Sequence, residues 1–171
     1  DATAAYMRSD YATALREFRT LAEQGDADAQ YTLGTMYYRG QGVPENDAET
    51  AKWFRKAAEQ GHAMAQNDLG AHYENGAGVP QSYAEALKWF SKAAEQGIAV
   101  AQNNLGFMHY NGEGVPEDYV KAHMWWSLAK AQGNEHASDN LDIIKEEMSH
   151  AQIAKAQELA AEWWERHNKR P

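Results

Sequence analysis

The sequence contains no cysteine, only four prolines and no long apolar run, and each absence excludes a class of protein. Without cysteine there is no disulfide, no thiolate nucleophile and no cysteine-ligated zinc. No apolar stretch approaches the ~20 residues that a membrane-spanning helix needs. The 16 lysines and arginines are spread along the chain in runs of at most two, so no basic cluster is available for nucleic-acid phosphates. The formal net charge of −9 favours a basic partner electrostatically.

What the sequence does contain is typical of helices. Hydrophobic residues make up 43% of the chain and are rich in alanine and tryptophan, whereas β-branched residues are too few for a sheet. A chain of 171 residues can form one domain with a sizeable core. The composition therefore predicts an all-α protein, and we expect a single domain over residues 1–171.

Self-similarity with a period of 36 residues organises the chain. When residues 25–60, 61–96 and 97–132 are aligned without a gap, thirteen positions are identical in all three copies. The clearest are Leu33-Gly34, Leu69-Gly70 and Leu105-Gly106, and the tryptophans Trp53, Trp89 and Trp125. Such a period predicts structural repeats that stack on one another.

Each copy is predicted to form two helices. In the middle copy the first helix spans residues 63–75; Gly76 follows as a left-handed C-terminal cap, and Pro80 blocks continuation. The second helix begins at Ser82, which forms a capping box with Glu85. Its apolar stripe consists of Ala86, Trp89, Phe90, Ala93 and Ala94.

The repeated small and large residues predict how the helices pack. Gly34, Gly70 and Gly106 lie inside helices, where glycine costs about 1 kcal/mol relative to alanine. That cost is tolerable where a neighbouring helix must approach closely. The three repeated tryptophans are predicted to fill the space between successive helix pairs, each burying ~150–250 Å².

The two ends of the chain differ from the full repeats. Residues 1–24 are predicted to form a partial repeat, and residues 133–148 begin a fourth repeat in which Asp142 replaces the packing glycine. Ser149 and Gln152 resemble another capping box, which opens a last helix to about His167. Residues 149–171 are therefore predicted to be a capping helix with a short tail.

The repeated unit A-x-A-Q-x-x-L-G-x-x-[YH]-x-x-G-x-G-V-P, followed by W-[FW]-x-x-A and a closing Q-G, resembles the Sel-one-like repeat, a tetratricopeptide-type unit with a longer turn. The resemblance covers about residues 11–141. It implies an all-α solenoid, a right-handed superhelix of helical hairpins with first helices on the concave side. It also implies a non-catalytic adaptor that binds proteins or peptides. Some secreted members staple each repeat with cysteine pairs, which this chain lacks.

The resemblance further implies which side chains face the groove. First-helix residues that are not used in packing would line it, and we predict a partner-binding set on that basis. The set consists of Tyr31, Thr35, Tyr38, Arg39, Asn67, Glu74, Asn75, Asn103, Phe107, Tyr110 and Asn111.

Two asparagines of this set, Asn67 and Asn103, carry the prediction of an extended peptide ligand. A carboxamide both donates and accepts, so it can pair with any peptide backbone. The alternative is that these side chains are solvated or help adjacent first helices to pack. Arg39 is the only cation of the set, which disfavours a peptide's terminal carboxylate and favours a neutral or basic segment.

Catalytic and metal chemistry have little support in the sequence. No two of the seven histidines are spaced i, i+3 or i, i+4, so no helix face carries a metal-binding pair. No nucleophile elbow, phosphate-binding loop or H-E-x-x-H motif is present. We therefore expect no cofactor and no metal. Trp125 and Trp126 are assigned to the core, whereas Trp164 is left open as a partner contact.

Three functions compete. The first is a protein- or peptide-binding adaptor that uses the groove. The second is a structural module of an envelope-associated complex that docks through its convex face or C-terminal helix. The third, a cell-wall-active hydrolase, is remote. The absence of an initiator methionine before Asp1, the bacterial-looking repeat and the habit of the family favour a periplasmic or secreted bacterial protein, with the cytoplasm as the alternative.

Overall fold

The computed structural model describes residues 1–168, and within them the chain forms ten α-helices and no strand. This confirms the predicted all-α fold. The helices are α1 (Ala2–Met7), α2 (Tyr11–Glu23), α3 (Ala27–Arg39), α4 (Asp47–Glu59), α5 (Ala63–Asn75), α6 (Tyr83–Glu95), α7 (Ala99–Asn111), α8 (Tyr119–Ala131), α9 (Glu135–Lys145) and α10 (His150–Asn168).

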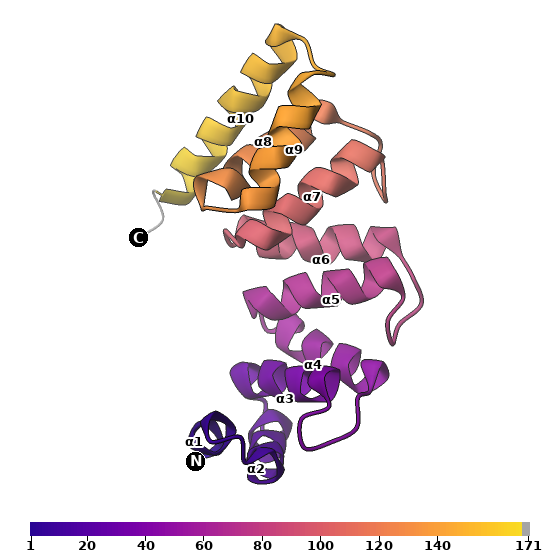
Figure 1. Ribbon diagram of the computed structural model, residues 1–171, viewed down its shortest axis with the longest axis vertical. Coiled ribbons are helices and arrows are strands. Elements are labelled where there is room, and N and C mark those ends of the chain that lie inside the picture. The colour runs from indigo at the N-terminus through magenta and orange to yellow at the C-terminus, as the bar shows by residue number, and fades with distance from the viewer. Residues whose placement is uncertain (169–171) are drawn as a thin grey trace. The chain divides into compact units, whose positions relative to one another are not determined.

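The chain divides into two compact units, Asp1–Trp89 and Phe90–Pro171, and the division falls inside α6. In the first unit, α1 with α2 and α3 with α4 form hairpins, followed by α5 (Figure 1). The predicted partial repeat at residues 1–24 corresponds to the hairpin of α1 and α2. The single domain over residues 1–171 stays a prediction.

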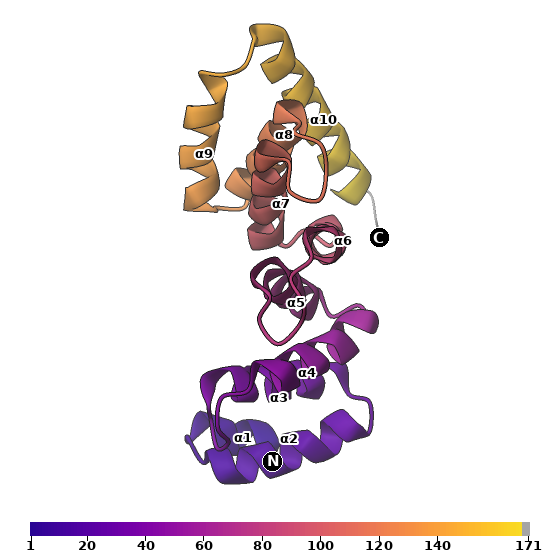
Figure 2. The same cartoon turned by 90° about the vertical axis from the view of Figure 1, so that its right-hand side faces the viewer.

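In the second unit, α7 and α8 form a hairpin, and α9 and α10 both pack against α8 (Figure 2). The capping box that the sequence predicts at the start of α10 is reciprocal. The Ser149 amide donates to Gln152 Oε1 at 2.9 Å, and the Gln152 amide donates to Ser149 Oγ at 3.2 Å. The predicted C-terminal helix is therefore confirmed, with its capping residues.

Local signals place the ends of the repeat helices. Asn46, Ser82 and Asp118 each accept a hydrogen bond from the amide three residues later, at 3.0, 3.3 and 3.0 Å. At the other end of α5, Gly76 has φ 69° and its amide donates to the carbonyl of His72. These contacts satisfy backbone groups that a helix end leaves unpaired.

Two of the repeated tryptophans, Trp53 and Trp89, connect their hairpin to the one before it. Trp53 is 5% exposed and belongs to a core cluster with residues of α1, α2 and α3. Trp89 is equally buried and packs with Phe54 and Leu69 of α4 and α5. The prediction that these rings fill the space between successive helix pairs is confirmed for both.

The glycine inside α3 has a specific neighbour. A Cβ on Gly34 would lie 2.6 Å from Phe54 Cδ1, which is too close for two carbon atoms. In the third repeat, a Cβ on Gly106 would collide with the indole of Trp126 in the same way. The predicted close approach is therefore correct at both positions, and an aromatic ring of the second helix of the same hairpin makes it.

A buried glutamine joins each first helix to the preceding second helix. Nε2 of Gln30, Gln66 and Gln102 donates to the carbonyl eight residues earlier, at 3.0, 3.0 and 3.2 Å. All three side chains are at most 5% exposed. These carbonyls lie in the last turn of a helix, and each also accepts a hydrogen bond from the amide of the glycine three residues later. The repeated A-x-A-Q motif thus has a role in pairing the hairpins that its spacing did not reveal.

Candidate partner-binding site

A pocket of about 310 Å³ opens between the first helices α3 and α5 of the first unit. Its size lies at the lower end of the range for ligand pockets. Phe54 of α4, only 3% exposed, contributes the apolar ring beneath the two first helices. The lining consists of Tyr31, Thr35, Tyr38, Arg39, Phe54, Asp68, Ala71, His72, Asn75 and Ala77.

Tyr31 is held in place by contacts on three sides. Its hydroxyl donates to Asp68 Oδ2 at 2.9 Å. Its ring stacks on the rings of Phe54 and His62, with ring centres 5.4 and 4.5 Å apart. Burial, together with the carboxylate of Asp68, raises the pKa of the Tyr31 phenol to about 12. The phenol is therefore a neutral hydrogen-bond donor at neutral pH.

The carboxylate of Asp68 is already engaged inside the protein. Oδ2 accepts from Tyr31, and Oδ1 accepts from Nδ2 of Asn67 at 2.9 Å. The negative charge at the pocket is consequently committed to fixing α3 against α5. A ligand entering the pocket meets a structural carboxylate rather than a poised base.

The rim of the pocket is open to solvent. Tyr38 is 57% exposed, and its ring meets His72 edge-on at 6.1 Å. Asn75 is exposed and donates from Nδ2 to the carbonyl of Ala71 at 2.9 Å, so its amide oxygen faces no donor within residues 1–168. Arg39 is exposed and makes no hydrogen bond or ion pair within the same residues. An exposed aromatic ring, an amide oxygen and a guanidinium therefore surround the entrance.

The structure brings together five residues of the predicted set. Tyr31, Thr35, Tyr38, Arg39 and Asn75 all line this one pocket. Glu74 is half-buried beside it and is absent from the lining. The remaining members apart from Asn67, namely Asn103, Phe107, Tyr110 and Asn111, belong to the second unit.

The two asparagines that motivated the peptide hypothesis do not present open carboxamides. Asn67 and Asn103 are each 6% exposed. Asn67 donates to Asp68, and Asn103 Oδ1 accepts from Nδ2 of Asn140 at 3.2 Å. Asn103 is buried on the side of α7 that contacts Asn140 of α9, and Asn67 is buried beside its neighbour Asp68. Their use in binding a partner is untested.

The equivalent surface of the second unit is filled by side chains. Phe107, which stands 72 residues after Thr35, meets the ring of Trp126 at 5.3 Å. Tyr110, the equivalent of Tyr38, stacks on Tyr119 at 5.3 Å and donates to Glu147 at 2.8 Å. Larger residues in this copy thus occupy the space that forms the pocket in the first unit.

Sequence reasoning missed several lining residues. None of Phe54, Asp68 and His72 was predicted as a site residue. No signal for Asp68 exists in the sequence alone, because the pairing is a side-chain contact between repeats that only the structure shows. It recurs at a separation of 37 residues: Tyr31 contacts Asp68, Asn103 contacts Asn140, and Tyr110 contacts Glu147 just after the end of α9.

Two other kinds of feature, a metal site and a membrane-spanning helix, are not found in the described residues. Among residues 1–168 there is no group of three or more histidine, aspartate or glutamate side chains arranged to hold a metal ion. No helix in the same range combines the length and the apolar character that crossing a bilayer requires.

The 36-residue hairpins, with a pocket between adjacent first helices, define a helical-repeat scaffold. The Sel1 repeat family matches residues 27–62, 63–98 and 99–134, and the chain belongs to this family. Proteins with these repeats generally act as adaptors in protein interactions. A search of curated proteins found no significant match.

Solved structures show the same fold. One similar structure is a protective antigen present in uropathogenic Escherichia coli strains, which displays an SLR fold; it is 36% identical, with a TM-score of 0.83, over 89% of this chain and 32% of that one. Another is a Sel1 repeat protein from Oxalobacter formigenes, which is 34% identical, with a TM-score of 0.78, over 83% of this chain and 58% of that one. The chain therefore spans about a third and about three fifths of their lengths.

Proposed function

We propose that this protein is a non-catalytic adaptor that binds an extended segment of a partner protein on the α3 and α5 face, with one partner side chain in the pocket. The observation that carries the proposal is the convergence of Tyr31, Tyr38, Arg39 and Asn75 on a single open pocket. Exposed aromatic and arginine side chains are the residue types that dominate interface energies. The adaptor role of the family supports the same reading.

The chemistry of the pocket favours binding over catalysis. The phenol of Tyr31 has a pKa of about 12 and stays protonated at neutral pH. Both carboxylate oxygens of Asp68 accept hydrogen bonds from the protein itself. A general base needs a pKa near the working pH and a free position next to the substrate.

We further propose that the partner segment as a whole is neutral or basic, because the chain carries a net charge of −9. A periplasmic or secreted location is part of the same proposal. It rests on the sequence resemblance, and detection of the full-length protein in periplasmic or culture fractions tests it.

Selection from a displayed peptide library tests the binding role. Peptides selected on the wild-type chain are expected to bind the double variant Tyr38→Ala/Arg39→Gln about 30-fold more weakly, as for the loss of an interface hot spot. Tyr83→Ala is the matched control, because this tyrosine is 38% exposed at the start of α6 and does not line the pocket. Equal affinity for the wild type and the double variant would refute the proposed site.

A second docking surface has specific support in the C-terminal helix. Trp164 of α10 is 40% exposed, which is unusual for so large an apolar ring. This observation favours the C-terminal helix as a further contact with a partner.

A further inference from the structure

A second pocket lies in the second unit, where the end of α10 meets the end of α6 and the end of α8. Its volume is about 420 Å³. The described residues that line it are Glu95, Gln96, Gly97, Gln132, Trp163, Trp164, His167 and Asn168. Trp164 is exposed at this pocket, whereas Trp163 is only 4% exposed and forms part of the core. None of these lining residues is a lysine or an arginine.

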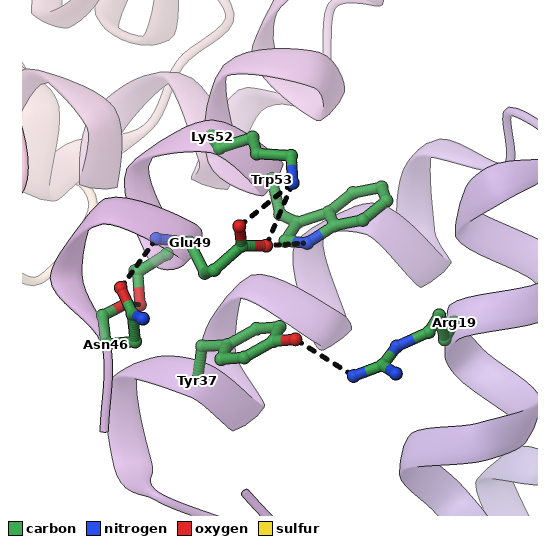
Figure 3. Close-up of polar contacts among 7 residues, drawn as sticks. Arg19, Tyr37, Asn46, Glu49, Lys52 and Trp53 are labelled. Atoms are coloured by element: carbon green, nitrogen blue, oxygen red, sulfur yellow. Dashed lines mark hydrogen bonds and ion pairs between the residues drawn. The ribbon is translucent and has the colours of Figure 1, made fainter. Parts of the chain in front are cut away.

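The repeats themselves show what a tryptophan and a carboxylate bind when they lie together. In α4, Lys52 Nζ donates to both carboxylate oxygens of Glu49 at 2.9 and 3.0 Å and lies 5.3 Å from the ring centre of Trp53 (Figure 3). In α6, Lys88 bridges Glu85 and the ring of Trp89 in the same way, at 3.1 and 5.2 Å. An ammonium held between a carboxylate and an indole is thus a recurring unit of this chain.

Among its described lining residues, the second pocket contains two parts of that unit and no lysine or arginine. The carboxylate of Glu95 is 54% exposed, and Trp164 presents an exposed indole at the same pocket. The described lining side chain that can carry a positive charge is His167, which contacts Oε2 of Glu95 and stacks on Trp163. A lysine from outside would find the same two kinds of group that Lys52 contacts in α4.

His167 orients the carboxylate of Glu95. Its ring stacks on Trp163 with ring centres 3.7 Å apart, Nδ1 lies 2.7 Å from the carbonyl of Trp163, and Nε2 lies 3.0 Å from Glu95 Oε2. A carboxylate oxygen only accepts, so a ring N–H that faces Glu95 donates to Oε2. Oε1 of Glu95 accepts no hydrogen bond from the residues 1–168 and is open to an ammonium.

We propose that this pocket binds a lysine side chain of a partner protein, with the ammonium at the carboxylate of Glu95 and the aliphatic stem along Trp164. The site is distinct from the α3 and α5 pocket and does not depend on it. The net charge of −9 provides attraction for a basic segment at long range, and the pocket provides the local selectivity.

The test uses the full chain and two small probes, N-acetyl-lysine methylamide and its uncharged isostere N-acetyl-norleucine methylamide. Binding is followed through the indole N–H signal of Trp164 in nitrogen-15 NMR spectra. The lysine probe is expected to shift this signal saturably, with an affinity at least tenfold above that of the norleucine probe.

Substitutions assign the effect to the pocket. Glu95→Gln keeps an acceptor for His167 but removes the charge, and it is expected to weaken the lysine probe about tenfold. Trp164→Leu keeps an apolar contact and removes the ring, with a similar expected loss, which is followed through the Trp163 indole signal. Glu162→Gln, on an exposed position of α10, is the control for overall charge and should leave the affinity unchanged.

Two results would overturn the assignment. The first is equal binding of the lysine and norleucine probes, which would indicate a merely apolar contact. The second is an equal loss of affinity in Glu95→Gln and Glu162→Gln, which would indicate attraction by net charge alone. Neither result bears on the peptide selection proposed for the α3 and α5 pocket.

Discussion

Trp125 of α8 and Trp163 of α10 meet edge to face, with ring centres 6.2 Å apart and ring planes at 70°. Both rings are buried, at 8% and 4% exposure. In the earlier repeats, lysine side chains cover the corresponding tryptophan instead. Lys52 and Lys56 lie over the ring of Trp53 at 5.3 and 4.6 Å.

The sequence changes at the positions of these lysines in the third repeat. Met124 stands 72 residues after Lys52, and Leu128 stands 72 residues after Lys56. Leu128 is 2% exposed. The outer face of α8 is apolar and α10 packs on it. The same face of α4 carries solvated lysines.

Restoring the repeat residue at this position should detach the C-terminal helix. Leu128→Lys places a charge in a buried contact and is expected to destabilise the docking of α10 by roughly 2 kcal/mol or more. Hydrogen exchange of the α10 amides measures the effect. Lys130→Leu, at an exposed position of α8, is the control, and unchanged protection of α10 in Leu128→Lys would contradict the explanation.

The buried glutamines give a prediction about stability. Gln66→Ala removes one of the two donors to the carbonyl of Ala58, which also accepts from the amide of Gly61, and is expected to cost about 0.5–1.5 kcal/mol in the free energy of unfolding. Urea denaturation measures the change. Gln157→Ala, at an exposed position of α10, should change it by less than about 0.5 kcal/mol. Comparable losses for the two variants would argue against the assigned role.

Gly34→Ala tests the close approach of Phe54. Alanine favours a helix over glycine by about 1 kcal/mol, but here its Cβ would lie 2.6 Å from the buried ring. Overpacking typically costs about 1–3 kcal/mol, so a net destabilisation is expected in thermal unfolding. In a Phe54→Leu background, which lacks the aromatic ring, Gly34→Ala should destabilise the protein less than it does in the wild type. A Gly34→Ala protein that is more stable than the wild type would show that the ring moves aside freely.

Two buried histidines predict a dependence of stability on pH. Burial lowers the pKa of His109 and of His123 below the ordinary histidine value of 6.5, and the nearby Lys121 and Lys145 act in the same direction. The unfolded chain then binds more protons, so this contribution to stability is complete above about pH 6.5 and declines as the pH falls below that value. The melting temperature is expected to decrease as the pH is lowered from 8 to 5. The decrease should be less steep in the double variant His109→Gln/His123→Gln than in the wild type. Identical slopes would assign the decrease to other groups.

His109 also occupies the position of a tyrosine that bonds to an arginine in the other repeats. Arg19 donates to Tyr37 at 2.9 Å and Arg55 donates to Tyr73 at 2.6 Å, whereas the third repeat has Ser91 in place of the arginine. The double substitution Ser91→Arg/His109→Tyr should restore this pair. A double-mutant cycle is expected to give a favourable coupling of about 0.5–1.5 kcal/mol. A coupling near zero would show that the third repeat does not bring the two positions together.

The sequence by itself determined the period, the helix ends and the core residues of this protein. Gly76, Asn46 and Ser149 act on backbone groups within a few residues, so their effects follow from local spacing alone. The thirteen identical positions fixed where the tryptophans would be buried, because every copy must present the same face to its neighbour.

Only the tertiary structure decided which side chains remain available to a partner. Asn67 and Tyr38 both lie on first helices, yet the first is 6% exposed and the second 57%. Asp68 of α5 accepts hydrogen bonds from Tyr31 of α3 and from its own neighbour Asn67, whereas the ring of Tyr38 only meets His72 edge-on at the rim of the pocket. Exposure depends on which side chain of another helix reaches across, and a helical period does not contain that information.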